Sequence, residues 1–506
     1  MNRARLRELR SAHGTELGVA ALAAIAALGG SLLAVGVTPA FVVAATAAVV
    51  LDMLPDVFVA EGIGTLRDFA KPLLAAGTTA LLVGGYTALI FTIGHWVGFR
   101  EMGKHAVVTL LALLVTTFLL TGSVLSAVGA GIAAAVAVIA GSTFFAPIGM
   151  SHSRRRVLRA GAVAAGAVGI GALFGPSSGA GQGREPGPVD PAAQSLLDDA
   201  TERGFSLPDT EGMISESFYQ VDIATATPDI SPEEWSVPVT GLVEREQDFT
   251  LEELREFPAE RRFVTLRCVS DTMNGTKMDT ALWTGVPVSE VLDEVGAPES
   301  CCVTLHGADD YYVSFPREAL DPGLFAYGMN GTELPRGHGF PLRTLVPGHW
   351  GETNAKWLTE IEIREEPEDG YWESRGWKGT GEVNTVAKLH GVDTSGEGIR
   401  VGGHAYAGTR GISAVEVSTD GGDSWTEATL SNRLPGATIV EDGDESPDAT
   451  GEAKDAWRMW QHEYEKNGNH EVVVRAIDGT GAVQNETKQD AFPEGATGWV
   501  STTVKP

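Results

Sequence analysis

Long uncharged stretches dominate the first 175 residues of the chain. Residues 17–37 and 72–93 carry no charged side chain over 21 and 22 positions, enough for a helix to cross a hydrocarbon layer of about 30 Å. Residues 106–147 are uncharged over 42 positions, too many for one span, and Thr121-Gly122-Ser123 offers a break. The pattern therefore predicts two single spans and a tight helical hairpin.

Two further segments bring the predicted number of spans to five or six. Residues 40–60 predict another helix, although Asp52, Pro55 and Asp56 interrupt them and also suit an interfacial turn. The small, apolar run at 160–175 follows an arginine triplet at 154–156. This arrangement is similar to a twin-arginine export signal, and it equally suits a basic stop beside a sixth helix. We therefore expect a transmembrane domain over residues 1–175.

Positive charge alone does not orient this domain. With five spans before the triplet, either orientation places six Lys and Arg residues on the cytoplasmic side. The twin-arginine interpretation breaks the tie, because it requires a cytoplasmic triplet. We therefore expect a multi-pass protein of the cell membrane whose later domains are extracellular.

Beyond residue 175 the apolar runs become shorter. Residues 176–211 are rich in Gly, Pro, Ser and Asp and have little periodicity, which is typical of a solvated linker. Residues 212–370 alternate short apolar runs with turns and with helical segments at 250–254 and 288–292. An α+β domain is expected there.

Regular β runs fill residues 371–506. Residues 411–425 contain an alternating strand, an Asp-Gly-Gly turn and the start of a partner strand, and residues 471–481 repeat this pattern. Several such runs predict an all-β immunoglobulin-like sandwich. The expected fold class is thus multi-domain, with an all-α transmembrane bundle, an α+β domain and this sandwich.

Charge divides the chain at the same boundary. Residues 1–175 have a net charge of +5, and residues 176–506 have a net charge of −34. A surface this acidic does not neutralise phosphates, which argues against nucleic acid as a partner. It suits a protein kept soluble in high salt, where screening weakens the repulsion between carboxylates. We therefore expect a halophilic source.

The chain contains three cysteines, and one of them follows a predicted strand. Cys301 and Cys302 are adjacent, and the odd total does not form a disulfide framework. Cys268 ends an apolar, β-branched run at 261–267 and precedes a polar loop that contains Gly275. Such a cysteine suits either a small buried hydrophobe or a metal ligand.

Several segments, in order, resemble the sulfite oxidase family of molybdopterin-dependent oxidoreductases over about residues 215–502. Thr265-Leu266-Arg267-Cys268 is similar to the family segment that ends in the molybdenum-ligating cysteine. Residues 338–348 resemble the cofactor-binding strand and loop, residues 351–357 continue that match, and residues 410–425 resemble the dimerisation domain. The resemblance implies a molybdenum–molybdopterin cofactor, oxidoreductase activity and a homodimer.

The resemblance also implies roles for individual residues. The implied catalytic residues are Cys268, Tyr311 and Arg410, although Tyr311 equally suits a half-buried strand aromatic. The implied cofactor-binding residues are Phe218, Tyr219, Cys268, Asp309, His338, Arg343, Asn354 and Lys356. A soft thiolate suits molybdenum held by a dithiolene. Cationic or N–H groups suit the dianionic phosphate of the pterin.

The expected substrate pocket departs from the family pattern. Met273 stands where animal and plant sulfite oxidases have an arginine that faces the substrate, and Gln220 aligns with another pocket arginine. The loop between Asn274 and Trp283 is also shorter. Because Arg410 alone would neutralise a doubly charged sulfite poorly, the sequence supports the cofactor better than the substrate.

Three functions fit these features. The first is a membrane-tethered molybdenum oxidoreductase that transfers an oxygen atom to or from a small oxyanion or sulfur compound, with sulfite oxidation as the default. The alternatives are an S-oxide or N-oxide reductase of the same family and a non-catalytic cell-surface binding protein.

Electrons require a separate route. The sequence contains no Cys-x-x-Cys-His haem motif, so a separate acceptor is expected, either a cytochrome, a cupredoxin or a quinone. His95 and His105 flank a predicted membrane loop. They are more simply loop residues than haem ligands, and a haem is not expected.

Overall fold

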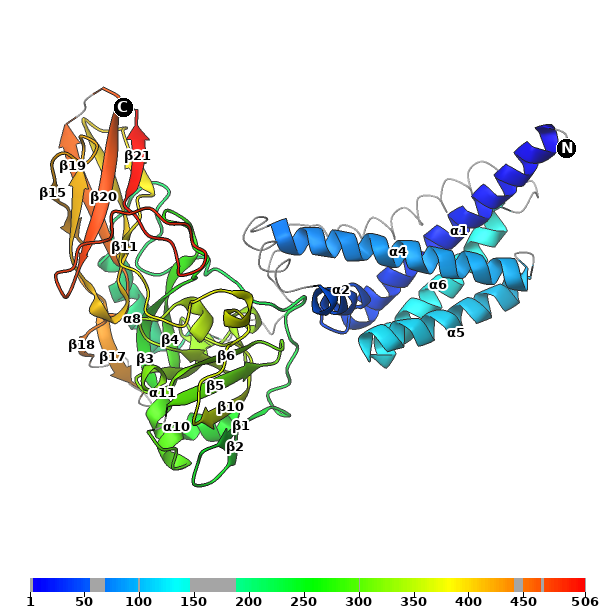
Figure 1. The fold of residues 1–506 in the computed structure, drawn as a ribbon, viewed down its shortest axis with the longest axis horizontal. Helices are drawn as coiled ribbons and strands as arrows, with labels where there is room; N and C mark the ends of the chain where they lie inside the picture. Colours follow the sequence, from blue (N-terminus) through cyan, green and yellow to red (C-terminus); the bar gives the residue numbers. More distant parts are fainter. Residues whose placement is uncertain are drawn as a thin grey trace. The chain divides into compact units, whose positions relative to one another are not determined.

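The computed structural model describes residues 3–54, 69–98, 101–145, 188–299, 301–440, 449–465 and 468–505 (Figure 1). The chain divides into two compact units. The first comprises residues 1–181 with 224–229, and the second comprises residues 182–223 with 230–506.

The first unit is built from helices. Their bounds are α1 (Arg3–Val35), α2 (Val42–Met53), α4 (Ala70–Val97), α5 (Met102–Thr121) and α6 (Val124–Phe145). Four segments are long and apolar enough to cross a membrane: Glu16–Val35, Ala70–Val97, Met102–Thr121 and Val124–Gly141. The 12 residues of α2 span about 18 Å, too short to cross alone. The sixth predicted helix and the arginine triplet lie outside the described residues.

The predicted helical hairpin is confirmed. α5 ends one residue before Gly122, which adopts the left-handed conformation and turns the chain into α6. Gly30 of α1 and Gly129 of α6 face one another so closely that a Cβ on either would overlap the opposite backbone. The Ser31 and Ser126 hydroxyls share a buried hydrogen bond of 2.8 Å. Small residues and buried polar pairs therefore join these helices.

A helix occupies part of the segment that the sequence predicted as a solvated linker. α8 (Pro191–Glu202) is capped by Asp190, whose carboxylate accepts a backbone N–H at 3.0 Å. Its buried face includes Leu196, which belongs to a core cluster with Phe263 and Met459. The apolar face was missed because it is made largely of alanines, which give a weak periodic pattern.

The α+β part of the second unit contains two sheets and short helices. The first sheet has the order β2-β1-β10-β5-β6. Its strands are β1 (Ser236–Gly241), β2 (Gln247–Thr250), β5 (Cys302–Gly307), β6 (Tyr312–Pro316) and β10 (Leu358–Arg364). The helices are α9 (Leu251–Glu256), α10 (Val288–Glu294) and α11 (Arg317–Leu320), of which α9 and α10 match the predicted helical segments.

The second sheet has the order β18-β17-β3-β4-β7-β8, with β9 paired to β7. Its strands are β3 (Glu260–Arg267), β4 (Met278–Pro287), β7 (Leu324–Met329), β8 (Thr332–Glu333), β9 (Arg343–Leu345), β17 (Pro435–Ile439) and β18 (Thr450–Glu452). β17 pairs with β3 at Thr438 and Arg261. The boundary predicted at residue 370 therefore divides the sequence but not this sheet.

The remaining strands form a β-sandwich. One sheet has the order β11-β13-β19-β16 with β12 beside β13, and the other has the order β15-β14-β20-β21. The strands are β11 (Val386–Ala387), β12 (Gly391–Asp393), β13 (Gly398–Tyr406), β14 (Ile412–Ser418), β15 (Thr426–Glu427), β16 (Thr429–Leu430), β19 (Arg458–Glu465), β20 (His470–Asp478) and β21 (Val500–Val504).

The sequence predictions for this sandwich are confirmed at the level of strands. β14 and β15 pair antiparallel around the predicted Asp-Gly-Gly turn, and β20 coincides with most of the second predicted run. Both sheets contribute to one core, as Val401 of β13 and Val474 of β20 show. The finer assignment, an immunoglobulin-like fold, stays a prediction.

The packing of α8 gives a first prediction. Leu196→Ala should lower the free energy of unfolding of the second unit by about 2–5 kcal/mol, because it leaves a cavity in a closed cluster. Thermal unfolding of the purified full chain would measure this. Gln194→Ala on the exposed face of the same helix is the control and should change little. Equal effects of both substitutions would show that α8 is not packed as described.

Candidate functional site

Cys268 lies where β3 ends. β3 and β4 pair antiparallel up to Arg267 and Met278, and the Cys268 N–H then donates to the Lys277 carbonyl at 3.0 Å. The side chain is buried, and its Sγ lies 3.1 Å from the Ser270 hydroxyl. The other two cysteines, Cys301 and Cys302, are bonded to each other, so Cys268 is the free thiol.

The surroundings of Cys268 keep its thiol protonated in the absence of a metal. Burial raises the pKa of Cys268, although the Ser270 hydrogen bonds lower it in part. A bound metal ion would displace this proton, since the thiolate is the ligating form. The position therefore suits a ligand that is inert until metal arrives.

Phe218 and Tyr219 are held close to the thiol. The Tyr219 N–H donates to Asp279 of β4 at 2.7 Å, and the Phe218 ring stacks on Tyr219. A Cβ at Gly351 would lie 2.8 Å from the Tyr219 hydroxyl and 3.5 Å from the Cys268 Cα. Glycine at 351 thus lets the loop before Asn354 pass between the tyrosine and the cysteine.

Arg343 is the buried cation of the site. Its guanidinium donates to the carbonyls of His338 and Asn354 at 3.0 and 3.2 Å, and it lies over the Trp283 ring at 5.0 Å. Burial lowers the pKa of Arg343 to about 10, so the group stays charged at neutral pH. The Asn354 side chain accepts from the Val346 N–H at 2.7 Å and therefore fixes the loop.

Lys356 adds a second cation beside His338. Its Nζ lies 2.7 Å from an Asp222 carboxylate oxygen and 3.1 Å from the Gly337 carbonyl. Burial, helped by the charges of Arg343 and Lys356, lowers the pKa of His338 to about 3. His338 is therefore neutral at physiological pH and offers an N–H or a lone pair, whereas the sequence left open whether it would be a cation.

Asp309 lies near Lys356, and Tyr311 lies near Asp309 and Cys268. The pKa of Asp309 is raised to about 6. Burial is the main cause, and the charge of Asp222 also raises the pKa, while Lys356 lowers it in part. The Tyr311 hydroxyl donates to the Glu352 carbonyl at 2.8 Å. Burial raises the pKa of Tyr311 well above its usual value, so this phenol is a proton holder at neutral pH.

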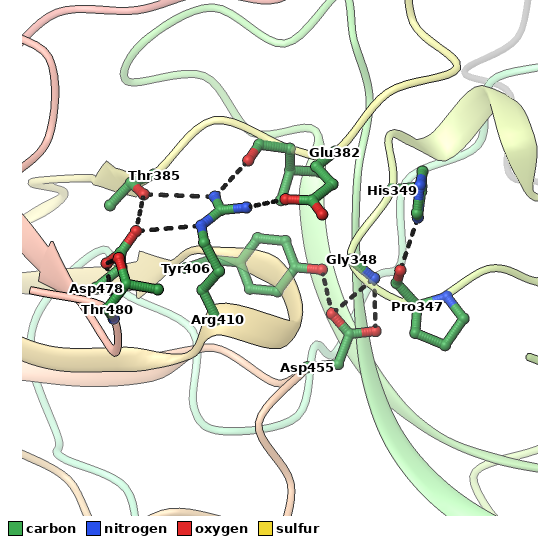
Figure 2. A network of polar contacts seen from close by, with 11 residues as sticks. Pro347, Gly348, His349, Glu382, Thr385, Tyr406, Arg410, Asp455, Asp478 and Thr480 are labelled. Atoms are coloured by element: carbon green, nitrogen blue, oxygen red, sulfur yellow. Dashed lines mark hydrogen bonds and ion pairs between the residues drawn. The ribbon is translucent and has the colours of Figure 1, made fainter. Parts of the chain in front are cut away.

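Arg410 lies in a different environment (Figure 2). It follows β13, and its guanidinium lies 2.6 Å from Glu382 and 3.1 Å from Asp478. It also donates to the Val383 carbonyl at 2.6 Å. Two carboxylates thus balance its charge, and its contact with a substrate stays a prediction.

The two positions where the sequence departs from the family are occupied by other contacts. The Met273 side chain packs against the core clusters of the sandwich and of Trp350. Gln220 lies against Gly337, where a Cβ would overlap its amide. Neither position supplies a cation.

A buried ion cluster beside Cys268 was not predicted. Asp271 lies 2.7 Å from the Lys388 Nζ and 3.3 Å from the Arg267 Nε, and all three side chains are at most 1% exposed. Burial alone would raise the pKa of Asp271, but Lys388 and Arg267 hold it below its usual value. Lys388 comes from the start of the sandwich, so only the fold brings it to this loop.

The two histidines of the first unit that were considered as haem ligands, His95 and His105, have local partners. His105 Nε2 lies 3.2 Å from the Ile90 carbonyl of α4, and His95 stacks on Phe91.

These residues fit a metal that brings most of its own ligands. Among the described residues, no cluster of three or more His, Cys, Asp or Glu side chains could hold a metal ion. One buried thiol is present, and the loop after β9 lies against Cys268 at Gly351, accepts a hydrogen bond from Arg343 at Asn354 and contains Lys356. A positive-φ glycine at 339 has no room for a side chain beside them. This donor set suits a metal–dithiolene group that carries a phosphate.

Family models decide the assignment. Residues 224–372 match the oxidoreductase molybdopterin binding domain, and residues 382–492 match the Mo-co oxidoreductase dimerisation domain. Together they cover just over half of the chain.

Residues 224–492 contain the two domains of the sulfite oxidase-like family of molybdopterin oxidoreductases.

This sulfite oxidase-like chain is therefore an enzyme, and its cofactor is molybdenum–molybdopterin. The expectation of a non-catalytic binding protein is not supported by this finding. The matched β-sandwich is the dimerisation domain of the family.

Curated relatives include both oxidases and reductases. The chain is 26% identical to sulfite oxidase from Arabidopsis thaliana over 51% of this chain and 78% of that protein. It is 26% identical to mitochondrial sulfite oxidase from Rattus norvegicus over 59% and 63%, respectively. It is 30% identical to nitrate reductase [NADH] 1 from A. thaliana, over 41% of this chain and 30% of that protein.

Among solved structures, the sulfane dehydrogenase from Paracoccus pantotrophus is similar. The match has a TM-score of 0.47 and 21% identity, and it covers 66% of this chain and 93% of that chain.

The ion cluster gives a second prediction. Asp271→Asn should destabilise this sulfite oxidase-like protein by about 3–5 kcal/mol, because Lys388 and Arg267 would keep buried charges without a counterion. Lys388→Met in the same background should recover part of the loss, since it removes one of those charges. Denaturant unfolding of the single and double variants tests this. Additive losses in the double variant would refute the charge explanation.

Proposed function

We propose that the protein is a membrane-tethered molybdenum enzyme that transfers an oxygen atom to a small sulfur oxyanion, with sulfite as the substrate. The observation that carries the proposal is the buried free thiol of Cys268, against which the loop after β9 lies at Gly351; Arg343 binds this loop at the Asn354 carbonyl, and Lys356 belongs to it. The similarity to two sulfite oxidases supports the choice of substrate.

Each residue of the site has a distinct task in this proposal. When bound, the cofactor supplies the oxygen-atom transfer and the two-electron redox chemistry. Cys268 would hold the metal through its thiolate. Arg343 and Lys356 would bind the anionic part of the pterin, while neutral His338 would donate or accept a hydrogen bond. Tyr311, protonated at neutral pH, would donate a hydrogen bond to a substrate oxygen in place of the Glu352 carbonyl that it contacts in this structure.

The membrane unit supports tethering. Four helical segments are long and apolar enough to span a bilayer. An extracellular, multi-pass arrangement with a separate cytochrome, cupredoxin or quinone as electron acceptor remains part of the proposal. A homodimer is proposed from the match to the dimerisation domain.

A second candidate is an S-oxide or N-oxide reductase. The observation that favours it is the balance of charge around the expected pocket: Arg410 is neutralised by Glu382 and Asp478, and Met273 is packed in apolar clusters. A pocket with little net positive charge suits a neutral oxide better than a dianion.

Metal content tests the role of Cys268. Cys268→Ser should lower the molybdenum content of the purified protein and abolish oxygen-atom transfer, because a serine hydroxyl is a harder donor than a thiolate and keeps its proton at neutral pH. A variant with both Cys301→Ser and Cys302→Ser lacks the other two cysteine sulfurs and should keep its molybdenum. Full molybdenum occupancy and full activity in Cys268→Ser would contradict the proposal.

Substrate assays separate the two candidates. With an artificial electron acceptor, the wild-type protein should oxidise sulfite, and with a reduced viologen it should reduce dimethyl sulfoxide or trimethylamine N-oxide more slowly. The ratio of kcat/KM values measures the preference. Turnover of the neutral oxides alone would favour the reductase.

A further inference from the structure

Asp455 is a buried carboxylate that lies outside the predicted site. It precedes β19 in the sandwich part of the chain and is joined to the loop that follows β9. Both of its carboxylate oxygens lie 3.1 Å from the Gly348 N–H. One of them also lies 2.7 Å from the Tyr406 hydroxyl (Figure 2). The loop that carries Gly348 continues directly into Asn354 and Lys356.

Asp455 is also joined to the strand that leads to Cys268. Its backbone carbonyl accepts the Thr265 N–H at 2.9 Å, and the Tyr406 hydroxyl lies 2.9 Å from the Thr265 carbonyl. The Thr265 hydroxyl accepts the Trp457 N–H at 2.8 Å. The segment around residue 455 therefore binds β3 three residues before the metal ligand and, at the same time, binds the cofactor loop.

The number of protons in this network depends on the state of Asp455. The single Tyr406 hydroxyl proton faces two acceptors, the Thr265 carbonyl and the Asp455 carboxylate. If Asp455 is ionised, the tyrosine must choose between them. If Asp455 is protonated, its O–H can donate to Tyr406, and Tyr406 can donate to Thr265. Only the protonated form completes both hydrogen bonds.

We propose that Asp455, in its protonated form, is a positioning residue that holds the cofactor loop at Gly348 against β3 and so fixes Cys268 relative to Arg343 and Lys356. This inference rests on the proposed role of Cys268 as the metal ligand. It assigns a function at the proposed molybdenum site to Asp455, a residue of the sandwich part of the chain. Asp455 is distant in sequence from the proposed cofactor residues and lies outside the strands of the sheet that contains β3.

The electrostatics of Asp455 agree with this geometry. Burial raises the pKa of Asp455 to about 7, although the Tyr406 and Gly348 hydrogen bonds lower it in part. Among the described residues, no Lys, Arg or His forms an ion pair with Asp455. The titratable group that faces it is Tyr406, which in turn senses Tyr219 and Arg410.

The sign of the pH dependence follows from the raised pKa. The folded state holds the proton more tightly than the unfolded chain does, so the contribution of Asp455 to stability is fully present below about pH 4. It falls as pH rises and is lost above about pH 7. The hydrogen bond from Tyr406 to the Thr265 carbonyl should therefore weaken over the same pH range, because Tyr406 then donates to the ionised Asp455 instead.

Four variants of the full-length, molybdenum-loaded protein test the proposal. Asp455→Asn keeps the shape and cannot ionise: its amide N–H₂ can donate to Tyr406, and its carbonyl can accept from Gly348. Asp455→Ala removes the side-chain hydrogen bonds to Gly348 and Tyr406. Tyr406→Phe removes the hydrogen bonds to Thr265 and Asp455 but keeps the contact between Asp455 and Gly348. Asp423→Asn, at an exposed position of the same sandwich, is the matched control.

The readout is the Mo(V) electron paramagnetic resonance signal after poising at a fixed potential from pH 5 to pH 9. It does not depend on which substrate is turned over, so a failed sulfite assay would not affect it. The wild type and Asp423→Asn should show a transition centred near pH 7. Tyr406→Phe should move it upward by about 1 pH unit, because a hydrogen bond that stabilises the carboxylate is lost.

Asp455→Asn should show the low-pH signal at every pH. Asp455→Ala should lose about 10- to 100-fold in molybdenum affinity or in turnover, as expected for a residue that orients a metal ligand. The proposal would be overturned if the wild type lacked the transition, if Asp455→Asn kept it, or if Asp455→Ala matched the wild type in metal content, signal and turnover.

Discussion

The ion pair between Asp271 and Lys388 is the contact on which the arrangement around Cys268 depends. The two groups lie 2.7 Å apart and are almost completely buried. Burying two charges is costly unless each is paired and hydrogen-bonded. Lys388 meets this condition, because it also donates to the Gly275 carbonyl at 2.8 Å. The pair thus holds the loop that follows Cys268 against the start of the sandwich.

Other contacts join the α+β part of the second unit to the sandwich part. Asn274 exchanges two hydrogen bonds with the backbone of Leu389, at 2.7 and 2.8 Å. β17 extends the sheet that carries β3, and Asp455 binds the loop after β9. The sandwich is therefore part of the structure that shapes the molybdenum site. Its match to a dimerisation domain describes one of its roles, and the contacts described above indicate another.

Local sequence patterns predicted the elements that local patterns encode. The apolar, β-branched run before Cys268 predicted β3, the Asp-Gly-Gly turn predicted the pairing of β14 and β15, and Thr121-Gly122-Ser123 predicted the helical hairpin. The cofactor residues were proposed through a family resemblance, because no short spacing in the chain links Cys268 to Arg343 or Lys356. In the fold, the loop after β9 lies against Cys268 at Gly351 and is bound by Arg343 at Asn354.

Contacts between distant segments were not predictable in this way. α8 was hidden by an alanine-rich face, and β17 pairs with a strand from the other predicted domain. The partners of Asp271 and Asp455 are chosen by tertiary packing, which periodicity does not report. The substrate also stayed open at the sequence level, because Met273 and Gln220 replace the expected cations without indicating what they recognise.

The coordination of molybdenum by Cys268 is the central claim. X-ray absorption at the molybdenum edge tests it most directly, because it counts sulfur ligands independently of activity. If Cys268 is a ligand, molybdenum in the wild-type protein should have one more sulfur ligand than molybdenum in Cys268→Ser, whose sulfur ligands would be those of the dithiolene alone. An identical number of sulfur ligands in the two proteins would contradict it.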